Sequence, residues 1–176
     1  MDAPVIERRA TAGITASGRV LSGYAAVYGV DTKIGGFTER IAPGAFKETL
    51  ASGRDVLALA DHDQRAVLGR TKTGTLTLHE DGHGLAFTLA LPDTQAGRDV
   101  AALAQRGDLG GMSFGFVATD EVWRGDTREL RAVELHEVSV VQAWPAYEQT
   151  TVSVRNRPPQ VGIFNGRELL WLDTCD

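Results

Sequence analysis

The chain has 176 residues, of which 43% are hydrophobic and 23% charged, a composition typical of one globular domain. A net charge of −5 with scattered basic residues argues against a nucleic-acid-binding surface, and no apolar run approaches the roughly 18–20 residues of a membrane span. The single cysteine, Cys175, excludes an internal disulfide and a cysteine metal site. The first residues lack the apolar segment of a signal peptide, so we expect a protein that works inside the cell that makes it.

Short strands dominate the predicted secondary structure. Apolar residues alternate with smaller or polar ones, as the side chains of a strand do on its two faces. The predicted strands are residues 21–30, 37–41, 56–60, 67–78, 85–91, the segment from 112 onward, and 133–141. Residues 118–132 are expected to form a polar hairpin, and residues 1–20 an edge strand or a loose arm.

Two helices are predicted between these strands. Pro43 opens the first, in a segment whose apolar residues recur four positions apart. Asp93 or Thr94 caps the second, which Gly107 ends. Together these elements predict an α+β fold, a β-rich single domain built on a barrel or a wrapped sheet.

The four histidines differ in their surroundings. His79 and His83 flank a predicted hairpin turn, where most side chains are solvated. His62 instead follows an apolar strand and lies between Asp61 and Asp63, at a strand-to-loop junction. Because active-site residues often occupy such junctions, His62 is the candidate general base. A solvated turn histidine is the alternative interpretation.

Ser113 is the candidate nucleophile. Glycines flank it in Gly-Gly-Met-Ser-Phe-Gly-Phe, which leaves the hydroxyl approachable and frees backbone N–H groups for an oxyanion hole. A serine nucleophile needs a nearby base, and that base needs an orienting partner. A strand serine beside a packing glycine is the alternative interpretation.

The strand at 133–141 carries candidates for the orienting partner. By period two, its odd-numbered residues share one face and its even-numbered residues the other, so His136 and Glu137 should point to opposite sides. A carboxylate in such an apolar strand needs a partner if it is buried, and a histidine N–H would be a natural one. An edge strand with solvated Glu and His is the alternative.

A metal site is another possible use of the same residues. It would comprise Asp61, His62 and Asp63 with His136 or Glu137, since mixed histidine and carboxylate sets bind divalent ions. Adjacent residues of an extended segment point to opposite sides, however, so Asp61 and His62 would not readily bind one ion together.

The order of the motifs resembles the prohead protease family of tailed bacteriophages. The motifs are Gly-Tyr-Ala-Ala-Val-Tyr at 23–28, Glu-Arg-Ile-Ala-Pro-Gly-Ala-Phe at 39–46, Asp-His-Asp at 61–63, Gly-Gly-Met-Ser-Phe-Gly-Phe at 110–116, Glu-Leu-His-Glu-Val-Ser-Val-Val at 134–141 and Pro-Ala at 145–146. The resemblance runs from about residue 20 to about residue 154. It divides the chain into an N-terminal arm or edge strand at 1–20, a protease domain at 21–154, and a tail at 155–176 for interaction or autoprocessing.

The resemblance implies a fold like the herpesvirus maturation protease, a β-barrel with surrounding helices. It implies a serine endopeptidase that cleaves phage scaffold, the major capsid protein and itself during procapsid maturation, with no metal or organic cofactor. The expected place is the host cytoplasm, inside the assembling procapsid. The expected partners are the major capsid protein and its scaffold segment, without nucleic acid or membrane, and a homo-oligomer is left open.

The family's histidine falls on His62 and its serine on Ser113. The family's Glu-Val-Ser motif favours Glu137 as the third member, while the second histidine of the herpesvirus relatives keeps His136 as the alternative. Ser139 in this motif is expected to be structural. A non-catalytic capsid-assembly module on the same fold is the main rival function, and a metal-dependent hydrolase is the second.

Overall fold

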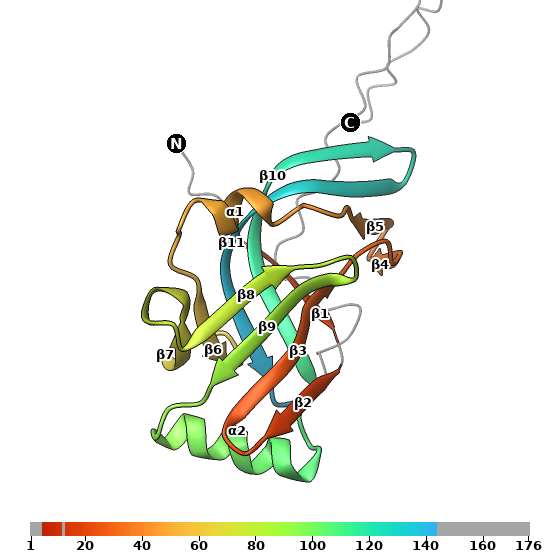
Figure 1. Ribbon diagram of the computed structural model, residues 1–176. Helices are drawn as coiled ribbons and strands as arrows, with labels where there is room; N and C mark the ends of the chain where they lie inside the picture. Colours follow the sequence, from red (N-terminus) through yellow and green to blue (C-terminus); the bar gives the residue numbers. More distant parts are fainter. Residues whose placement is uncertain (1–4, 12, 144–176) are drawn as a thin grey trace, which may run out of the picture.

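The structure is a computed structural model that describes residues 5–11 and 13–143 (Figure 1). Its elements in chain order are β1 (Glu7–Thr11), β2 (Ile14–Ser17), β3 (Val20–Val27), β4 (Thr32–Ile34), β5 (Phe37–Ile41), α1 (Lys47–Ala51), β6 (Leu57–Ala60), β7 (Asp63–Arg70), the 3-10 turn η1 (Thr71–Thr73), β8 (Leu76–Glu80), β9 (Gly84–Ala90), α2 (Gln95–Arg106), β10 (Gly111–Arg124) and β11 (Thr127–Val141). The described part is therefore β-rich with few helices, as the sequence predicts.

The larger sheet is organised around the long strand β11. Its strand order is β1-β10-β11-β5-β4, with β6 also paired to β11 and β7 paired to β6. One edge of β11 carries β10, and the other carries β5 and β6 in parallel at different heights. Because β6 pairs with residues 137–140 of β11, the chain leaving β6 emerges beside the C-terminal end of β11.

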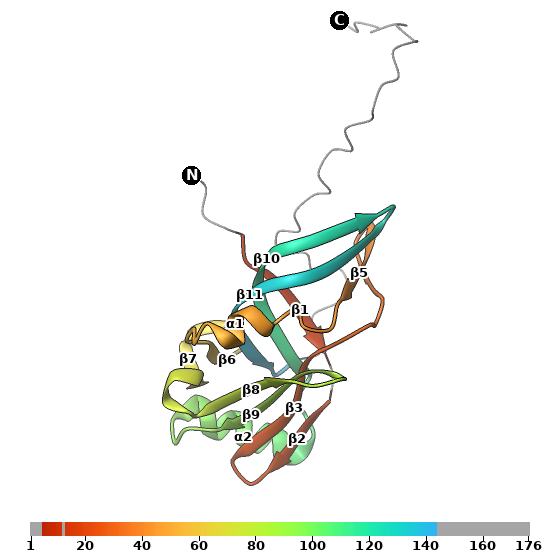
Figure 2. The same ribbon diagram turned by 45° about the horizontal axis from the view of Figure 1, so that its top comes forward.

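The smaller sheet has the order β2-β3-β9-β8 and lies in front of β10 and β11 in Figure 1. One apolar core joins the two sheets: Leu21 and Phe87 come from the smaller sheet, and Phe114 and Val138 from the larger. Figure 2 shows the same arrangement from a tilted view, with α2 at the end opposite the β10–β11 hairpin. In the described residues the strands form two sheets and no closed barrel, so the predicted barrel is not confirmed.

The second helix confirms the caps that its sequence predicts. The Thr94 hydroxyl accepts a hydrogen bond from the Gly97 backbone N–H at 3.2 Å, and Gly107 ends α2 in the left-handed conformation (φ 75°). The first helix packs its preceding Phe46 fully into the core. Its Thr49 hydroxyl donates to the Val133 carbonyl at 2.8 Å, which ties α1 to β11. No helix in residues 5–11 and 13–143 is long and apolar enough to cross a membrane.

Two predicted strand boundaries need correction. The single strand predicted at 67–78 is two strands, because the chain turns through η1 after Arg70 and resumes as β8 at Leu76. Gly74 adopts a left-handed conformation there, and the Thr75 hydroxyl accepts a hydrogen bond from the Arg70 backbone N–H at 2.9 Å. The polar hairpin predicted at 118–132 is the end of the longer β10–β11 hairpin. The predicted Pro-Ala motif at 145–146 and the tail at 155–176 lie outside the described residues.

Candidate active site

Strand register brings the candidate serine and the candidate glutamate onto neighbouring strands. Ser113 in β10 pairs with Ser139 in β11, and Ser139 pairs with Leu59 in β6. Directly paired residues lie on the same face of a sheet. Ser113, Ser139 and Leu59 therefore lie in one row on the same face of the sheet. The chain turns into His62 directly after the end of β6, the third strand of this row.

His62 is held in a strained two-residue turn between paired Ala60 and Asp63. Asp61 and His62 both have positive φ, 47° and 62°, a conformation that costs about 1–2 kcal/mol for a residue other than glycine. The Asp61 carboxylate compensates by accepting hydrogen bonds from the Gln142 backbone N–H at 2.9 Å and from its side-chain amide at 2.7 Å. These bonds fasten the turn to the end of β11.

The imidazole of His62 lies against the carboxylate of Glu137. Its Nδ1 is 2.6 Å from Glu137 Oε1, and the Glu137 residue is only 7% exposed. With Nδ1–H donating to the carboxylate, Nε2 keeps a lone pair and can act as a base. The structure thus joins two residues that lie 75 positions apart, and both were singled out from sequence.

Two further side chains contact the same carboxylate. The Ser139 hydroxyl donates a short hydrogen bond to Glu137 Oε2, and Arg8 Nε in β1 lies 3.5 Å from Oε1. Burial alone would raise the pKa of Glu137, but the hydrogen bonds from His62 and Ser139 and the charge of Arg8 bring that pKa below its ordinary value. Glu137 is therefore held as a carboxylate in a buried site.

Gly115 provides the space in which this carboxylate lies. It pairs with Glu137 across the β10–β11 ladder, and a Cβ added to Gly115 would lie 2.6 Å from Glu137 Oε1. Such a distance is well inside van der Waals contact, so any larger residue would displace the carboxylate. Gly115, the third glycine of the Ser113 motif, thus makes room for the Glu137 carboxylate as well as for access to the serine.

A β-bulge corrects the face assignment made from sequence. The register of β10 and β11 shifts between Gly115, which pairs with Glu137, and Phe116, which pairs with Leu135. His136 is therefore an extra residue of β11 without a paired residue on β10. Leu135 and Val138 are consequently both fully buried in the core, although strict alternation puts them on opposite faces. The prediction that odd and even residues of this strand divide cleanly between two faces is therefore wrong.

The structure gives His136 partners other than His62. Its Nδ1 lies 3.2 Å from an Arg54 guanidinium nitrogen, and its Nε2 lies 2.9 Å from Glu134 Oε1. Burial and the charge of Arg54 lower the pKa of His136, which favours the neutral ring. Among the candidate third members, Glu137 is the one in hydrogen-bond contact with His62.

Ser113 is 3% exposed, and its hydroxyl makes no hydrogen bond to any other described residue. The contact between Ser113 and a base is therefore not formed in this state, although its strand neighbours position it in the same row as Ser139. Nucleophile–base hydrogen bonds are often long in substrate-free enzymes and tighten only when substrate binds.

The residues of the proposed metal set do not converge. In the described ranges, no group of three or more His, Cys, Asp or Glu side chains is placed to hold a metal ion. Asp61 binds Gln142, and Asp63 accepts from the Arg65 backbone N–H at 2.9 Å. The segment at Asp61-His62 is also a left-handed turn and not the extended segment that the sequence suggested.

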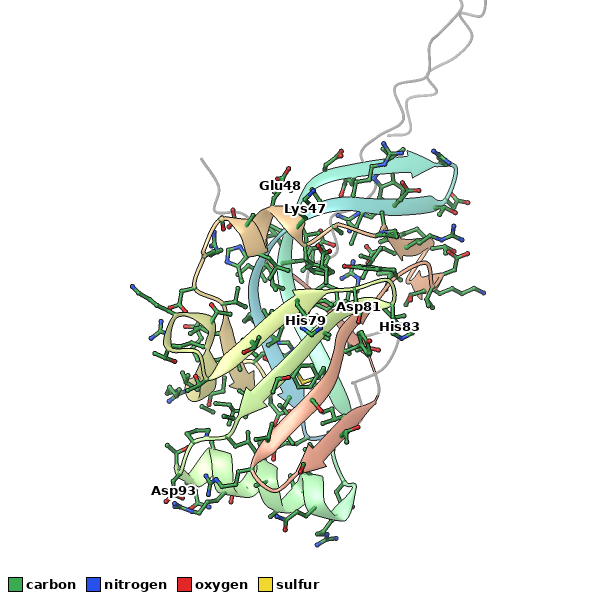
Figure 3. All side chains as sticks on the ribbon, in the orientation of Figure 1. Lys47, Glu48, His79, Asp81, His83 and Asp93 are labelled. Atoms are coloured by element: carbon green, nitrogen blue, oxygen red, sulfur yellow. The ribbon has the colours of Figure 1, made fainter. Side chains whose placement is uncertain are left out.

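The remaining histidines lie elsewhere, on the smaller sheet. Figure 3 shows His79 and His83 on the β8–β9 hairpin, and both are exposed. The His83 ring contacts Tyr24 edge-on, with ring centroids 4.5 Å apart. Sequence reasoning missed Arg8 and the Asp61–Gln142 contact, because both depend on strand pairings that local patterns do not reveal.

Comparisons with known proteins identify the family and the fold of the chain. The family model described as caudovirus prohead serine protease matches residues 5–161. Among solved structures, the bacteriophage T4 capsid assembly protease gp21 is similar in fold, with a TM-score of 0.57 and 11% identity over 79% of this chain and 96% of that chain. No curated protein matches the chain significantly.

Proposed function

The chain belongs to the caudovirus prohead serine protease family, and we propose that Ser113 is its nucleophile, His62 its general base and Glu137 the residue that orients His62. The family makes the protein a serine peptidase of capsid maturation. The 2.6 Å contact of His62 Nδ1 with buried Glu137, next to the row that contains Ser113, is the observation that carries this assignment.

The proposed reaction is acyl transfer through an acyl-enzyme. The Ser113 hydroxyl attacks the carbonyl carbon of a peptide bond while His62 Nε2 takes its proton, and the Glu137 carboxylate stabilises the imidazolium that forms. Backbone N–H groups close to the serine receive the oxyanion. His62 then protonates the leaving amine, and a water molecule, activated by the same imidazole, releases the acyl group and restores the serine.

The proposed substrates are the major capsid protein with its scaffold segment, and the protease itself. In this proposal the enzyme acts inside the assembling procapsid in the host cytoplasm. A relation of the fold to the herpesvirus maturation protease, including its barrel, belongs to the same proposal. The family membership supports a role in capsid maturation, and it leaves the cleavage sites to experiment.

The test is cleavage of the capsid protein encoded with this protease, followed by intact mass. The parent protein, Ser113→Ala and the control Ser17→Ala, which removes an exposed hydroxyl of β2, are incubated side by side. We expect fragments with the parent and with Ser17→Ala. Ser113→Ala should lower the rate by about 10⁴- to 10⁶-fold, since the nucleophile is lost. Equal cleavage by Ser113→Ala would overturn the assignment, and intact masses in all three samples would favour a non-catalytic assembly module.

A further inference from the structure

Ser139 has a contact that the proposed triad does not use. Its hydroxyl donates to Glu137 Oε2, whereas His62 binds the other oxygen, Oε1. Ser139 is completely buried, and it pairs directly with Ser113 across the β10–β11 ladder. Ser139 is thus paired with the proposed nucleophile, and its hydroxyl binds the carboxylate that orients His62.

We propose that Ser139 is a positioning residue, whose hydroxyl fixes the rotation of the Glu137 carboxylate so that Oε1 is presented to His62. The proposal rests on the proposed function, because it gives Ser139 a task in the same site. It also replaces the purely structural role that the sequence motif suggests for this serine.

Three geometric constraints support this role. Residues two apart on a strand share a face, so Ser139 and Glu137 lie side by side on β11. The terminal torsion of a glutamate is soft, so the carboxylate needs partners on both oxygens to hold one orientation. Gly115 closes the remaining side, where the backbone of β10 leaves no space for a Cβ. Each oxygen of the carboxylate therefore has a hydrogen-bond donor, and the backbone of β10 at Gly115 packs against its remaining side.

The charged groups around Glu137 do not replace this donor. His62 contacts Oε1, and Arg8 approaches the same oxygen from β1 at the longer distance of 3.5 Å, with its side chain 41% exposed. His136 on β11 itself is turned toward Arg54 and Glu134. In the described residues, Ser139 is the side chain that satisfies Oε2. Without it, a buried carboxylate oxygen has lost its donor.

The test measures Glu137 directly. The side-chain carboxyl carbon of Glu137 is followed by NMR against pH in a Ser113→Ala background, which prevents self-digestion, and Glu137→Gln identifies its signal. The hydrogen bond from Ser139 helps to lower the pKa of Glu137, so Ser139→Ala should raise that pKa. Ser139→Thr keeps the hydroxyl and should restore the parent titration. Ser139→Cys, close to serine in size but a weaker donor, should lie between.

Activity gives the second readout, with Ser113 intact. We expect Ser139→Ala to lower the rate of capsid-protein cleavage about 10- to 100-fold and to move the acidic limb of its pH profile to higher pH. Rescue by Ser139→Thr or Ser139→Cys would support the role. A folded Ser139→Ala protein with an unchanged Glu137 titration would overturn it. A parent protein without peptidase activity would count against the proposed function, whereas the titration, which needs no turnover, would still decide the role of Ser139.

Discussion

This protein buries two groups of charged residues. Both contain glutamates, but the basic side chain that pairs with these glutamates differs between the groups. In the candidate active site, the carboxylate of Glu137 is paired with the imidazole of His62. Elsewhere in the same sheet, Glu7, Glu39 and Glu121 surround the guanidinium groups of Arg9 and Arg128. We call this second group the arginine cluster.

The arginine cluster is a fixed arrangement of charge. Arg128 is 1% exposed and donates to Glu7 at 2.8 Å, to Glu39 at 2.9 Å and to Glu121. Arg9 donates to Glu39 and Glu7 as well. A guanidinium does not release its proton in proteins, so neither arginine of the cluster can exchange a proton with a substrate. An imidazole can, so the two groups differ in the proton chemistry that their basic side chains allow.

One strand joins the two regions. Along β1, Glu7 and Arg9 point into the arginine cluster, and Arg8 between them points to Glu137. Neighbouring residues of β1 contact different groups because the side chains of a strand alternate between its two faces. The ion pairs of Glu7 and Arg9 thus connect β1 to β11 and β5, and β1 also pairs with β10 opposite Ser113.

The largest expected difference between the regions concerns activity. Glu137→Gln removes the charge that stabilises the imidazolium and should lower the cleavage rate about 10⁴-fold. Glu39→Gln is the matched change in the arginine cluster, since Glu39 is 2% exposed and equally buried among partners. We expect it to lower stability and to leave the cleavage rate per folded molecule unchanged. Cleavage assays on folded protein check both, and a Glu39→Gln enzyme as inactive as Glu137→Gln would erase the distinction.

The next largest effect concerns stability. Arg128→Met removes two hydrogen bonds to buried Glu7 and one to buried Glu39, and should reduce the free energy of unfolding by about 3–5 kcal/mol. The control is Arg40→Met, which breaks the exposed Arg40–Asp31 pair and should change stability by about 0–1 kcal/mol. Urea unfolding measures both. Equal losses in the two variants would show that the buried ion pairs of the arginine cluster stabilise the fold no more than an exposed pair does.

A smaller effect is expected at the turn that carries His62. Asp61→Gly relieves the strain of positive φ but removes the carboxylate that binds Gln142, and we expect about a tenfold loss of activity from a misplaced imidazole. Asp61→Asn tolerates the same backbone and keeps an acceptor, so it should retain most activity. Cleavage rates of the two variants show whether Asp61 matters for its hydrogen bonds to Gln142 or only for its backbone conformation. If only the backbone conformation mattered, Asp61→Gly would be fully active.

The smallest effect is the response to acid. The pKa of Glu7 and that of Glu137 both lie below the ordinary value of 4.5, in each case because hydrogen bonds and positive charges outweigh burial. Each carboxylate therefore adds stability that is present above pH 4.5 and is lost as the pH falls through the lowered pKa. Glu137→Gln removes this titration, so the variant should lose less stability than the parent on acidification. Urea unfolding at neutral and acidic pH would contradict this if parent and variant respond alike.

Local patterns predicted much of the fold and, at the candidate site, singled out both His62 and Glu137. The caps of α2, the strand that leads to His62 and the Glu137 strand follow from periodicity and turn residues, which depend only on near neighbours. The strand predicted at 67–78 failed because its turn depends on the Thr75 hydroxyl bonding back to Arg70, a contact that outweighs the alternation of side chains.

What the patterns could not provide is register. The bulge opposite Gly115 and Phe116 places Leu135 and Val138 in one core, and only the pairing of β10 with β11 reveals it. Arg128 lies in the segment predicted as a polar hairpin, yet its partner Glu7 is 121 positions away and both are buried. Charged residues give no sequence signal for burial when their partners lie on distant strands.

The proposed activation of Ser113 depends on the imidazole of His62, which Glu137 holds at 2.6 Å. The most direct measurement is labelling with a fluorophosphonate, which reacts with activated serines, followed by mapping of the modified residue by mass spectrometry. Parent, His62→Ala and His83→Ala proteins are compared, the last removing an exposed histidine of the smaller sheet. We expect one adduct on Ser113 in the parent and in His83→Ala, and almost none in His62→Ala. Labelling of another serine, or equal labelling of Ser113 in His62→Ala, would contradict it.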